Sequence, residues 1–499
     1  MIDPIRLGRA PMITKLCRLA AMVASGLLMA AAVAAPSFAQ EAAGVVPNPN
    51  KQDMFQLNDL ETFRKFSQLK NFEIVGHSYF RGPWMVPGAS GSGVNTLRIC
   101  GNVAYLAGYN PTVYGVLLVD ISNPADMQVL SFIPANAGTR SAYLRVDCGR
   151  KILAMAHSGW PENPNKPTAD EPLKTGITLH DVTDPRNPKR ISEYNNAGGA
   201  THGMEMDDQY VYLCGTTENS KPRDEELMIL DYTNPASVKL AATWHVTGQH
   251  KGENFSEMNQ KNPNGQTDQF ITCHEIIKDG NRLYMAYRDA GVIILDITDR
   301  TKPVEVGTFD FVPPYNGDPG MPLGCCPGAH TAAPVPHEGK PLPTLLVLTD
   351  EHFSCPPGFG QVLDISEPKR MMVLSTYRIE EVDDQYDQAT GKFVCKQGQQ
   401  STHLPWFDPR SHGALVYQAW YDQGLRAIDI SNPFKPKEVG YYISPDFSIP
   451  QQAGRHTREA YTDPTTNLIY VTDGNGGGIT VLRYTGPMPS RPPIPGGAR

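Results

Sequence analysis

A motif of nine or ten residues recurs six times along this chain and sets the strongest limit on its fold. Each copy has an apolar run, an aspartate, and a short polar segment that usually ends in proline. The copies are Gly115–Pro124 (GVLLVDISNP), Gly176–Pro185 (GITLHDVTDP), Glu226–Pro235 (ELMILDYTNP), Gly291–Arg300 (GVIILDITDR), Gly360–Pro368 (GQVLDISEP) and Gly424–Pro433 (GLRAIDISNP). Neighbouring motif aspartates lie 50 to 68 residues apart, which is typical of β-propeller blades rather than of solenoid repeats.

Each repeat contains four patterns typical of β-strands. A β-rich run such as VEVGTFDF follows the motif, and two more precede it, joined by tight turns such as Asp279-Gly280-Asn281. An aspartate shortly before Asn-Pro or Asp-Pro favours a turn in which its carboxylate accepts backbone N–H groups. We therefore expect a structural role for the motif aspartates, which are Asp120, Asp181, Asp231, Asp296, Asp364 and Asp429.

The six motifs resemble the repeats of the LVIVD-repeat family of bacterial β-propeller proteins. The resemblance covers roughly residues 72–485. It implies a propeller fold, and it indicates no particular chemistry because one fold hosts many functions.

The two ends of the chain share a seventh blade. Arg455–Tyr461, Leu468–Asp473 and Ile479–Tyr484 supply three strands, with Arg483 where the other copies carry aspartate. The missing fourth-strand pattern occurs at Asn71–Arg81 (NFEIVGHSYFR). The sequence therefore predicts an all-β, seven-bladed propeller whose N-terminal strand closes the last blade and leaves no open edge there.

The segment before the propeller predicts a leader and a helix. Basic residues precede an apolar run at Leu19–Ala35, and Ser37-Phe38-Ala39 offers small residues for cleavage, so residues 1–39 resemble a signal peptide. Met12 is an alternative start, and an uncleaved anchor is the alternative interpretation. Residues 53–69 place most of their apolar side chains on one helical face, which predicts a short capping helix; these are Phe55, Leu57, Leu60, Phe63, Phe66 and Leu69.

These boundaries divide the chain into a signal peptide at 1–39, a linker with the helix at 40–70, the propeller at 71–484 and a Pro-rich tail at 485–499. The formal net charge is −8, and removal of the leader, which carries +3, leaves −11. An acidic surface argues against a nucleic-acid partner or an anionic membrane. No other stretch is apolar enough to span a bilayer. We expect a periplasmic or secreted protein.

Eight cysteines remain after the leader, which permits disulfides in an exported protein. Cys100 and Cys148 occupy matching positions at the ends of adjacent inner strands and can be cross-linked. The vicinal pair Cys325-Cys326 is expected to bond to Cys355 and Cys395. Thiolate ligation of a metal by the vicinal pair is the alternative.

Histidine opens the innermost strand of five consecutive repeats. Aligning the repeats by their turns places one histidine at the same position in blades three to seven: His202, His274, His330, His403 and His456. In a propeller these strand ends surround the mouth of the central channel. Imidazole nitrogens that converge from several strands suit a divalent transition metal such as Zn, Fe, Cu or Mn.

Two other interpretations remain open for this position. The histidines can be structural, each hydrogen-bonded to a neighbouring blade. Asn95 and Tyr143 stand at the same position in blades one and two, and we consider them catalytic candidates on the side that the histidines leave open.

A second layer of the channel carries two arginines. Arg145 and Arg458 lie two residues beyond the ring position of their strands, so they are expected to face the channel and can hold a substrate carboxylate. Pairing with Glu205, Glu459 or another buried acid is the alternative. Glu275 adjoins His274 but is expected to point away from the channel.

Long connections gather at the face where the innermost strands begin; they are residues 158–175, 246–269, 312–329 and 381–400. Long loops on one face of a rigid scaffold are typical of binding sites. The sequence therefore favours a metal-dependent oxidoreductase, lyase or hydrolase acting on a small organic substrate. The alternative is a non-catalytic propeller that binds a protein or polysaccharide through the same loops.

Overall fold

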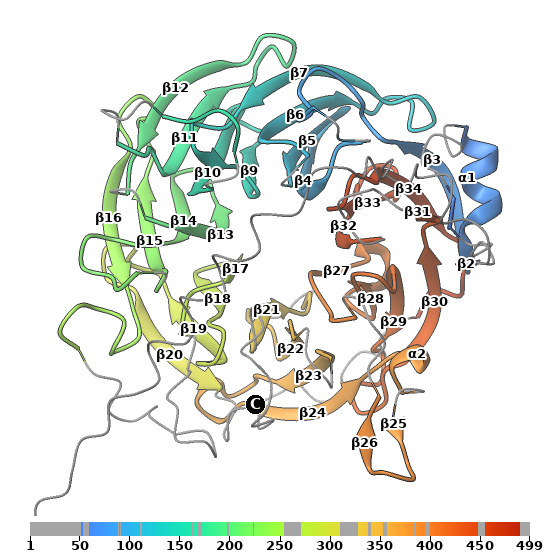
Figure 1. Ribbon diagram of the computed structural model, residues 1–499. Helices are drawn as coiled ribbons and strands as arrows, with labels where there is room; N and C mark the ends of the chain where they lie inside the picture. Colours follow the sequence, from blue (N-terminus) through green and yellow to red (C-terminus); the bar gives the residue numbers. More distant parts are fainter. Residues whose placement is uncertain are drawn as a thin grey trace, which may run out of the picture. The chain divides into compact units, whose positions relative to one another are not determined.

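Seven antiparallel sheets, each built on four strands, follow one another around a common axis (Figure 1). The computed structural model describes residues 51–52, 59–87, 89, 91–109, 112–160, 163–167, 172–196, 199–222, 224–253, 271–309, 328–337, 341–352, 357–383, 386–394, 400–447 and 455–489. The predicted leader, residues 53–58, most of the tail and Cys325, Cys326, Cys355 and Cys395 lie outside these residues. The predicted seven-bladed propeller is confirmed.

The blades are given with their strands from the channel outward. Blade 1 is β4 (Val94–Cys100), β5 (Val103–Gly108), β6 (Gly115–Asp120) and β7 (Gln128–Pro134); blade 2 is β9 (Leu144–Asp147), β10 (Ile152–Gly159), β11 (Gly176–Asp181) and β12 (Lys189–Tyr194). Blade 3 is β13 (Thr201–Met206), β14 (Tyr210–Gly215), β15 (Glu226–Asp231) and β16 (Lys239–Trp244); blade 4 is β17 (Glu275–Asp279), β18 (Arg282–Ala286), β19 (Val292–Asp296) and β20 (Val304–Phe309). Blade 5 is β21 (Ala329–Pro334), β22 (Leu345–Asp350), β23 (Gly360–Asp364) and β24 (Met372–Tyr377); blade 6 is β27 (Pro405–Phe407), β28 (Leu415–Ala419), β29 (Leu425–Asp429) and β30 (Lys437–Ile443). Blade 7 is β32 (Thr457–Thr462), β33 (Ile469–Asp473), β34 (Gly478–Tyr484) and β3 (Phe72–Ser78).

Several short helices and strands occur in addition to the four main strands of each blade. They are α1 (Leu60–Phe66), α2 (Glu380–Asp383), β1 (Lys51–Gln52), β2 (Gln68–Lys70), β8 (Thr139–Arg140), β25 (Tyr386–Asp387), β26 (Lys392–Phe393) and β31 (Asp446–Phe447). Strand β2 extends blade 6 by pairing with β30. Among the described helices, none has the length and apolar character needed to cross a bilayer.

The motif aspartates form the predicted turns. Each lies at the end of a third strand, and its Oδ1 atom accepts the backbone N–H two residues later at 2.8–2.9 Å; the six are Asp120, Asp181, Asp231, Asp296, Asp364 and Asp429. This bond closes the turn and satisfies a donor that would otherwise be unpaired. In blade 7, Arg483 replaces the aspartate and pairs instead with Glu73 at 2.8 Å.

The proline turns pack against the fourth strand of the preceding blade. The hydroxyls of Ser131 and Ser192 donate to the carbonyls of Pro185 and Pro235, both at 2.6 Å. Gly76, in the outer strand of blade 7, meets the turn of blade 1 so closely that a Cβ there would lie 1.7 Å from the Pro124 carbonyl oxygen. The contact between the last and first blades is therefore of the same type as the contact between consecutive blades.

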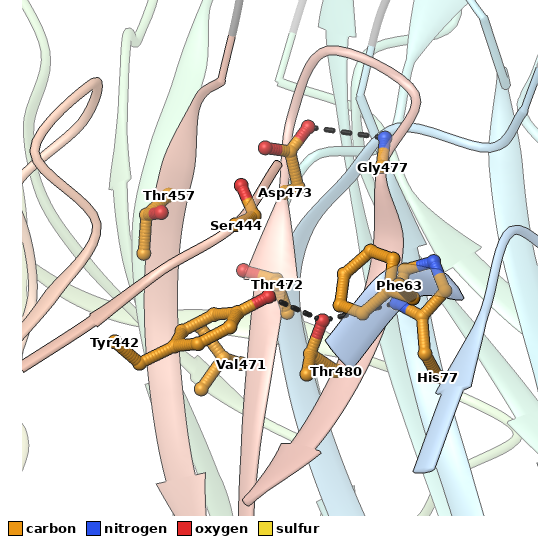
Figure 2. Close-up of a pocket in the computed structure, with 10 residues that line it drawn as sticks. All are labelled: Phe63, His77, Tyr442, Ser444, Thr457, Val471, Thr472, Asp473, Gly477 and Thr480. Carbon is orange, nitrogen blue, oxygen red and sulfur yellow. Dashed lines mark hydrogen bonds between the residues drawn. The ribbon is translucent and has the colours of Figure 1, made fainter. Parts of the chain in front are cut away.

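The closure of the ring by β3 is confirmed. Strand β3 pairs antiparallel with β34, and Ile74 faces Leu482. Helix α1 covers the junction: the Phe63 ring stacks on His77 at 3.7 Å between centroids, and Thr480 Oγ1 lies 3.0 Å from His77 Nδ1 and 2.8 Å from the Tyr442 hydroxyl (Figure 2). The cavity left here is only about 10 Å³, so it holds at most one water molecule. The side chains between α1, β3 and β34 therefore pack the junction and leave no room for a ligand larger than water.

Helix α1 is shorter than the sequence predicted. It begins after Asp59, whose carboxylate caps Thr62, and it ends at Phe66. Leu69 lies in β2 because the backbone of residues 68–70 pairs with the free edge of β30. Edge pairing satisfies more backbone groups than one further helical turn would.

Two disulfides are present among the described residues. Cys100–Cys148 joins the ends of β4 and β9, as expected from their matching positions. Cys214–Cys273 joins β14 to the segment before β17, and this pair was not predicted. Both link one blade to the next.

The close approach at Gly76 predicts that Gly76→Ala weakens ring closure. The added methyl has to displace backbone rather than a flexible side chain, so we expect a loss of about 1–3 kcal/mol in the free energy of unfolding. Gly149→Ala is the matched control, since its Cβ meets only the Asp147 carboxylate at 3.3 Å. Equal urea midpoints for the two variants would contradict the assigned closure.

Candidate functional site

The innermost strands bring the seven aligned positions together at one end of the channel. His202 and His330 lie at the start of β13 and β21, His274 and His456 directly precede β17 and β32, and His403 lies two residues before β27. Asn95 in β4 and Tyr143, just before β9, complete the ring. All seven side chains are buried except His202, which is half-buried.

Four of the histidine rings form a continuous arc. The centroids of neighbouring rings lie 3.8 Å apart for His202 and His274, 4.4 Å for His274 and His330, and 4.2 Å for His330 and His403. His456 is separated from this arc by Tyr421, whose ring lies 5.0 Å from His403 and 4.6 Å from His456.

The Nδ1 atoms attach most of this arc to the blades. His202 Nδ1 donates to the His274 carbonyl at 2.9 Å, His274 Nδ1 donates to the His330 carbonyl at 3.3 Å, and His403 Nδ1 donates to the Arg458 carbonyl. Each bond reaches the next blade, so the structural role considered from the sequence is present. These same bonds place the hydrogen on Nδ1 and leave the Nε2 lone pair to act as an acceptor or ligand.

The free Nε2 atoms face a buried carboxylate. Within the described part of the chain, the Nε2 atoms of His330 and His403 are buried and have no hydrogen-bond partner. Glu351 Oε2 lies 3.6 Å from His330 Nε2 and 3.9 Å from His274 Nε2. The ligand atoms of His274, His330 and Glu351 all lie within 4.8 Å of one another, as do those of His202, His274 and Glu275. The histidines are thus grouped in pairs with a glutamate rather than as one set of five.

Burial and the nearby arginines hold the imidazoles neutral. Burial, together with the positive charges of Arg288 and Arg140, lowers the pKa of His202 to about 3. Burial also places the pKa values of the other four histidines well below 6.5. Burial alone would raise the pKa of Glu351, but Arg288, Arg458 and a hydrogen bond from Tyr421 lower it to about 2. Neutral imidazoles beside an ionised carboxylate form a donor set for a transition metal.

Arg288 occupies part of this donor set. Its Nη2 atom contacts His274 Nε2 and lies 2.7 Å from Glu351 Oε2. A guanidinium remains charged at any ordinary pH, so this nitrogen donates to the neutral imidazole. A metal ion bound by His274, His330 and Glu351 therefore requires Arg288 to withdraw.

A cavity of about 360 Å³ lies against the arc. Besides Asn95, Tyr143 and four of the five histidines, all but His403, its walls include residues that follow second strands: Tyr109, Trp160, Arg288, Glu351 and Tyr421. Sequence analysis missed these five because most blades differ in residue type at this position. The register that aligned the first strands also aligns the ends of the second strands, and that signal was available.

Arg458 lines this cavity, and Asn95 positions it. Arg458 Nε donates to Asn95 Oδ1 at 2.8 Å, Arg458 Nη1 lies 3.1 Å from the Tyr421 hydroxyl, and the guanidinium lies over the Tyr109 ring at 4.4 Å. Asn95 Nδ2 in turn donates to the Ala142 carbonyl at 2.7 Å. Asn95 is thus occupied in holding Arg458.

Arg145 lies elsewhere, in a second channel cavity of about 340 Å³. There it pairs with Glu205 at 3.0 Å, the alternative considered from the sequence, while Arg98 pairs with Glu459 at 2.8 Å. Glu275 lines this cavity too, and burial raises its pKa to about 7. Arg145 and Arg458 are therefore not brought together around one ligand.

Tyr143 lines both cavities. Its ring lies 4.8 Å from His202, and burial raises its pKa well above 10. The phenol therefore stays protonated near neutral pH, and it can donate a hydrogen bond or a proton but does not serve as a base.

Comparison with known proteins identifies the repeats. The model of the LVIVD repeat matches residues 93–132, 275–311 and 412–444, in blades 1, 4 and 6. Similar solved structures include the computationally designed Ika8 protein, at 10% identity and a TM-score of 0.42. Another is the Cps50 (Swd1) β-propeller domain of Myceliophteria thermophila, at 12% identity and 0.47. Both alignments cover 80% of this chain and 98% of the other. No curated protein matches the chain.

The depressed histidine pKa values predict that the metal-free protein loses stability as the pH falls below 6.5. Unfolded histidines take up protons there, whereas buried ones resist until the pH approaches their lower folded pKa. Each such group contributes a slope of up to about 1.36 kcal/mol per pH unit.

Replacing His330 by glutamine removes one such group, so the free energy of unfolding should depend less steeply on pH between pH 6 and pH 4.5. The measurement is urea unfolding with a chelator present, and the slope should fall by up to about 1.36 kcal/mol per pH unit. Asp350 and Glu275, whose pKa values burial raises to about 7, oppose the trend over this range. Both are retained in the variant, so the difference between the two proteins reports on His330. Parallel curves would show that His330 is protonated in the folded protein.

Proposed function

Taking the chain as a β-propeller with LVIVD repeats, we propose that it is an exported, metal-dependent enzyme that acts on a small anionic molecule in the channel mouth. The observation that carries the proposal is that the buried Nε2 atoms of His330 and His403 have no hydrogen-bond partner among the described residues, while the ionised carboxylate of Glu351 lies 3.6 Å from His330 Nε2. Leaving buried polar atoms unpaired costs free energy, and a bound ligand offsets that cost. His202 and His274 extend the same donor set.

A divalent transition metal suits these donors. Neutral imidazole nitrogens and one carboxylate are typical ligands of zinc and of non-haem iron, and both leave coordination positions open in catalytic sites. When bound there, such an ion would supply Lewis-acid or redox chemistry, as in an oxidoreductase, lyase or hydrolase.

The charged side chains around the cavity favour an anionic substrate. Arg140, Arg288 and Arg458 line it against the single carboxylate of Glu351. A guanidinium binds a carboxylate through paired hydrogen bonds, and Arg458 is already held in place by Asn95 and Tyr421. Tyr143 also lines the cavity, and its protonated hydroxyl can donate a hydrogen bond to a substrate. The cavity volume of about 360 Å³ fits a small organic molecule.

The two disulfides support export. Such bonds persist in oxidising compartments and are rare in the cytosol. Together with the leader pattern at residues 1–39, they favour a periplasmic or secreted location.

The proposal predicts that His330→Ala with His403→Ala removes metal from the channel. Truncating two ligands should weaken binding by more than the ~10–100-fold typical of changes to residues that only support a ligand. Metal content of natively purified protein and activity should fall together, while circular dichroism stays unchanged. His337→Ala is the matched control, because His337 pairs with Asp279 at 2.8 Å and does not line the channel cavity. Equal metal content in all three proteins would favour a non-catalytic propeller.

Arg288→Met tests the competition between the guanidinium and a metal. Two positive charges about 4 Å apart repel each other by roughly 4 kcal/mol at an effective dielectric constant of 20, so removing one should tighten metal binding more than tenfold. Methionine retains a long side chain in the same space. Unchanged or weaker affinity in a competition titration would show that Arg288 does not share the metal position.

A further inference from the structure

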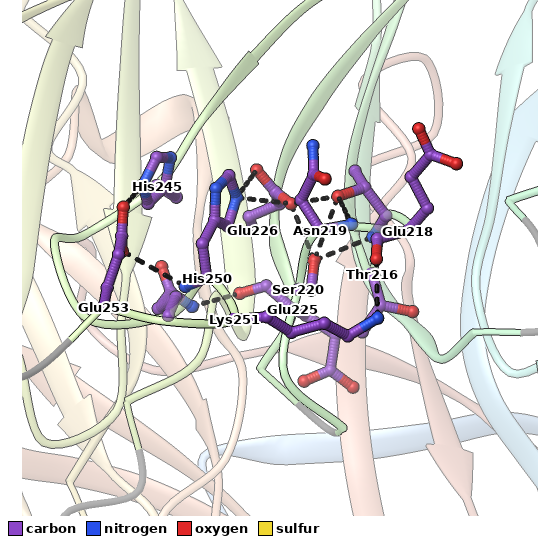
Figure 3. A network of polar contacts seen from close by, with 12 residues as sticks. Thr216, Glu218, Asn219, Ser220, Glu225, Glu226, His245, His250, Lys251 and Glu253 are labelled. Carbon is purple, nitrogen blue, oxygen red and sulfur yellow. Dashed lines mark hydrogen bonds and ion pairs between the residues drawn. The ribbon is translucent and has the colours of Figure 1, made fainter.

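A second histidine–glutamate cluster lies in blade 3 and shares no residue with the channel cavity (Figure 3). Glu226 is the first residue of β15, and His245 directly follows β16. His250 and Glu253 lie in the connection that leads on toward blade 4. One ligand atom each from Glu226, His245 and His250 lies within 4.8 Å of the other two.

From this geometry we infer a second divalent-metal site, formed by Glu226, His245 and His250 with Glu253 beside them. Its donors are two imidazole nitrogens and carboxylate oxygens, the set that zinc and similar ions accept. The inference does not depend on the proposed channel chemistry.

The side chains of the cluster contact one another in histidine–carboxylate pairs. His250 Nε2 lies 3.2 Å from both oxygens of Glu226, and His245 Nε2 lies 3.2 Å from Glu253 Oε1. The two imidazole rings stack at 3.6 Å between centroids with an angle of 15° between their planes. One divalent ion could therefore accept a nitrogen from each ring and a carboxylate oxygen from Glu226.

Glu226 is held in place before any ion binds. Its side chain is fully buried, and Oε1 accepts hydrogen bonds from the hydroxyls of Thr217 and Ser220, both at 2.7 Å. Supporting hydrogen bonds of this kind orient a metal-binding carboxylate.

The connection that carries the other donors is equally fixed. Glu253 Oε2 accepts the backbone N–H groups of Gly248 at 2.8 Å and of His250 at 3.2 Å. Buried Gln249 donates to the Glu225 carbonyl at 2.9 Å and accepts from the Tyr287 hydroxyl of blade 4 at 3.0 Å. The His245 and His250 side chains remain 27% and 20% exposed, which gives an ion access from solvent.

A bound ion would tie the start of β15 to the connection between blades 3 and 4. The Cys214–Cys273 disulfide joins the same two blades, and the Cys273 N–H donates to the Glu225 carbonyl that Gln249 also binds. The second site therefore has a structural role, in contrast to the open cavity of the channel.

The experiment uses chelator-stripped full-length protein titrated with Zn²⁺ against a chromophoric competitor. In a background carrying His330→Ala and His403→Ala, about one Zn²⁺ should still bind per chain and raise the melting temperature. Adding His245→Ala and His250→Ala should weaken this binding at least ~100-fold and abolish the Zn²⁺-dependent rise in melting temperature. His337→Ala in the same background should retain both.

Co²⁺ substitution gives a second readout. Its visible absorption bands should appear in the channel-depleted background and disappear in the variant that also lacks His245 and His250. Glu253→Gln, which keeps the side-chain shape, covers the case in which the histidine variants fail to fold, and it should weaken Zn²⁺ binding. Undiminished Zn²⁺ binding in the folded histidine variant, or no binding in the channel-depleted background, would overturn the inference. If the channel site proposed above does not bind metal but the second site does, the wild-type protein should hold one ion. Replacing His245 and His250 by alanine should then remove that ion.

Discussion

The contact between each motif turn and the outer strand of the preceding blade determines the arrangement of the ring. Five blade junctions show it directly: Ser131 with Pro185, Ser192 with Pro235, Gly307 with Pro368, Ser375 with Pro433, and Gly76 with Pro124. Only a small side chain fits opposite the turn, and the aspartate bond keeps the turn in shape. The repeated contact fixes the rotation from one blade to the next. Because the rotation repeats, equivalent positions on the inner strands must face the same axis.

That geometry explains how much the sequence could predict. The fold, the closure by residues 72–78 and the gathering of His202, His274, His330, His403 and His456 all follow from repeat register, which is visible in one sequence. The sequence did not point to Glu351, Arg288 and Tyr421, because most blades differ in residue type where the second strand ends. Cys214–Cys273 escaped because Cys273 lies outside the repeated pattern. Register identifies positions well, but it identifies chemistry only where the same residue type recurs.

The second layer shows a further limit of symmetry. Arg145 and Arg458 occupy equivalent positions, but their partners differ. Arg145 pairs with Glu205 in the second channel cavity, whereas Arg458 bonds to Asn95 beside the histidines. A long arginine side chain can extend toward either of the two channel cavities. Its direction depends on which hydrogen-bond partner the neighbouring blade provides. Blade 1 offers Asn95 to Arg458, whereas blade 3 offers Glu205 to Arg145. Backbone symmetry cannot specify that choice, because it depends on side chains that differ between blades.

Charge couples the binding of the metal to the binding of the substrate in the proposed site. The charged side chains lining the histidine cavity are Arg140, Arg288, Arg458 and Glu351, and the imidazoles beside them are neutral, so the lining carries a net positive charge before any metal binds. A divalent ion adds to that charge in a buried space where repulsion is strong. An anionic ligand relieves it, and by thermodynamic linkage each partner must then favour the binding of the other. The arginines that repel the metal are, on this argument, the groups that make metal binding depend on the substrate.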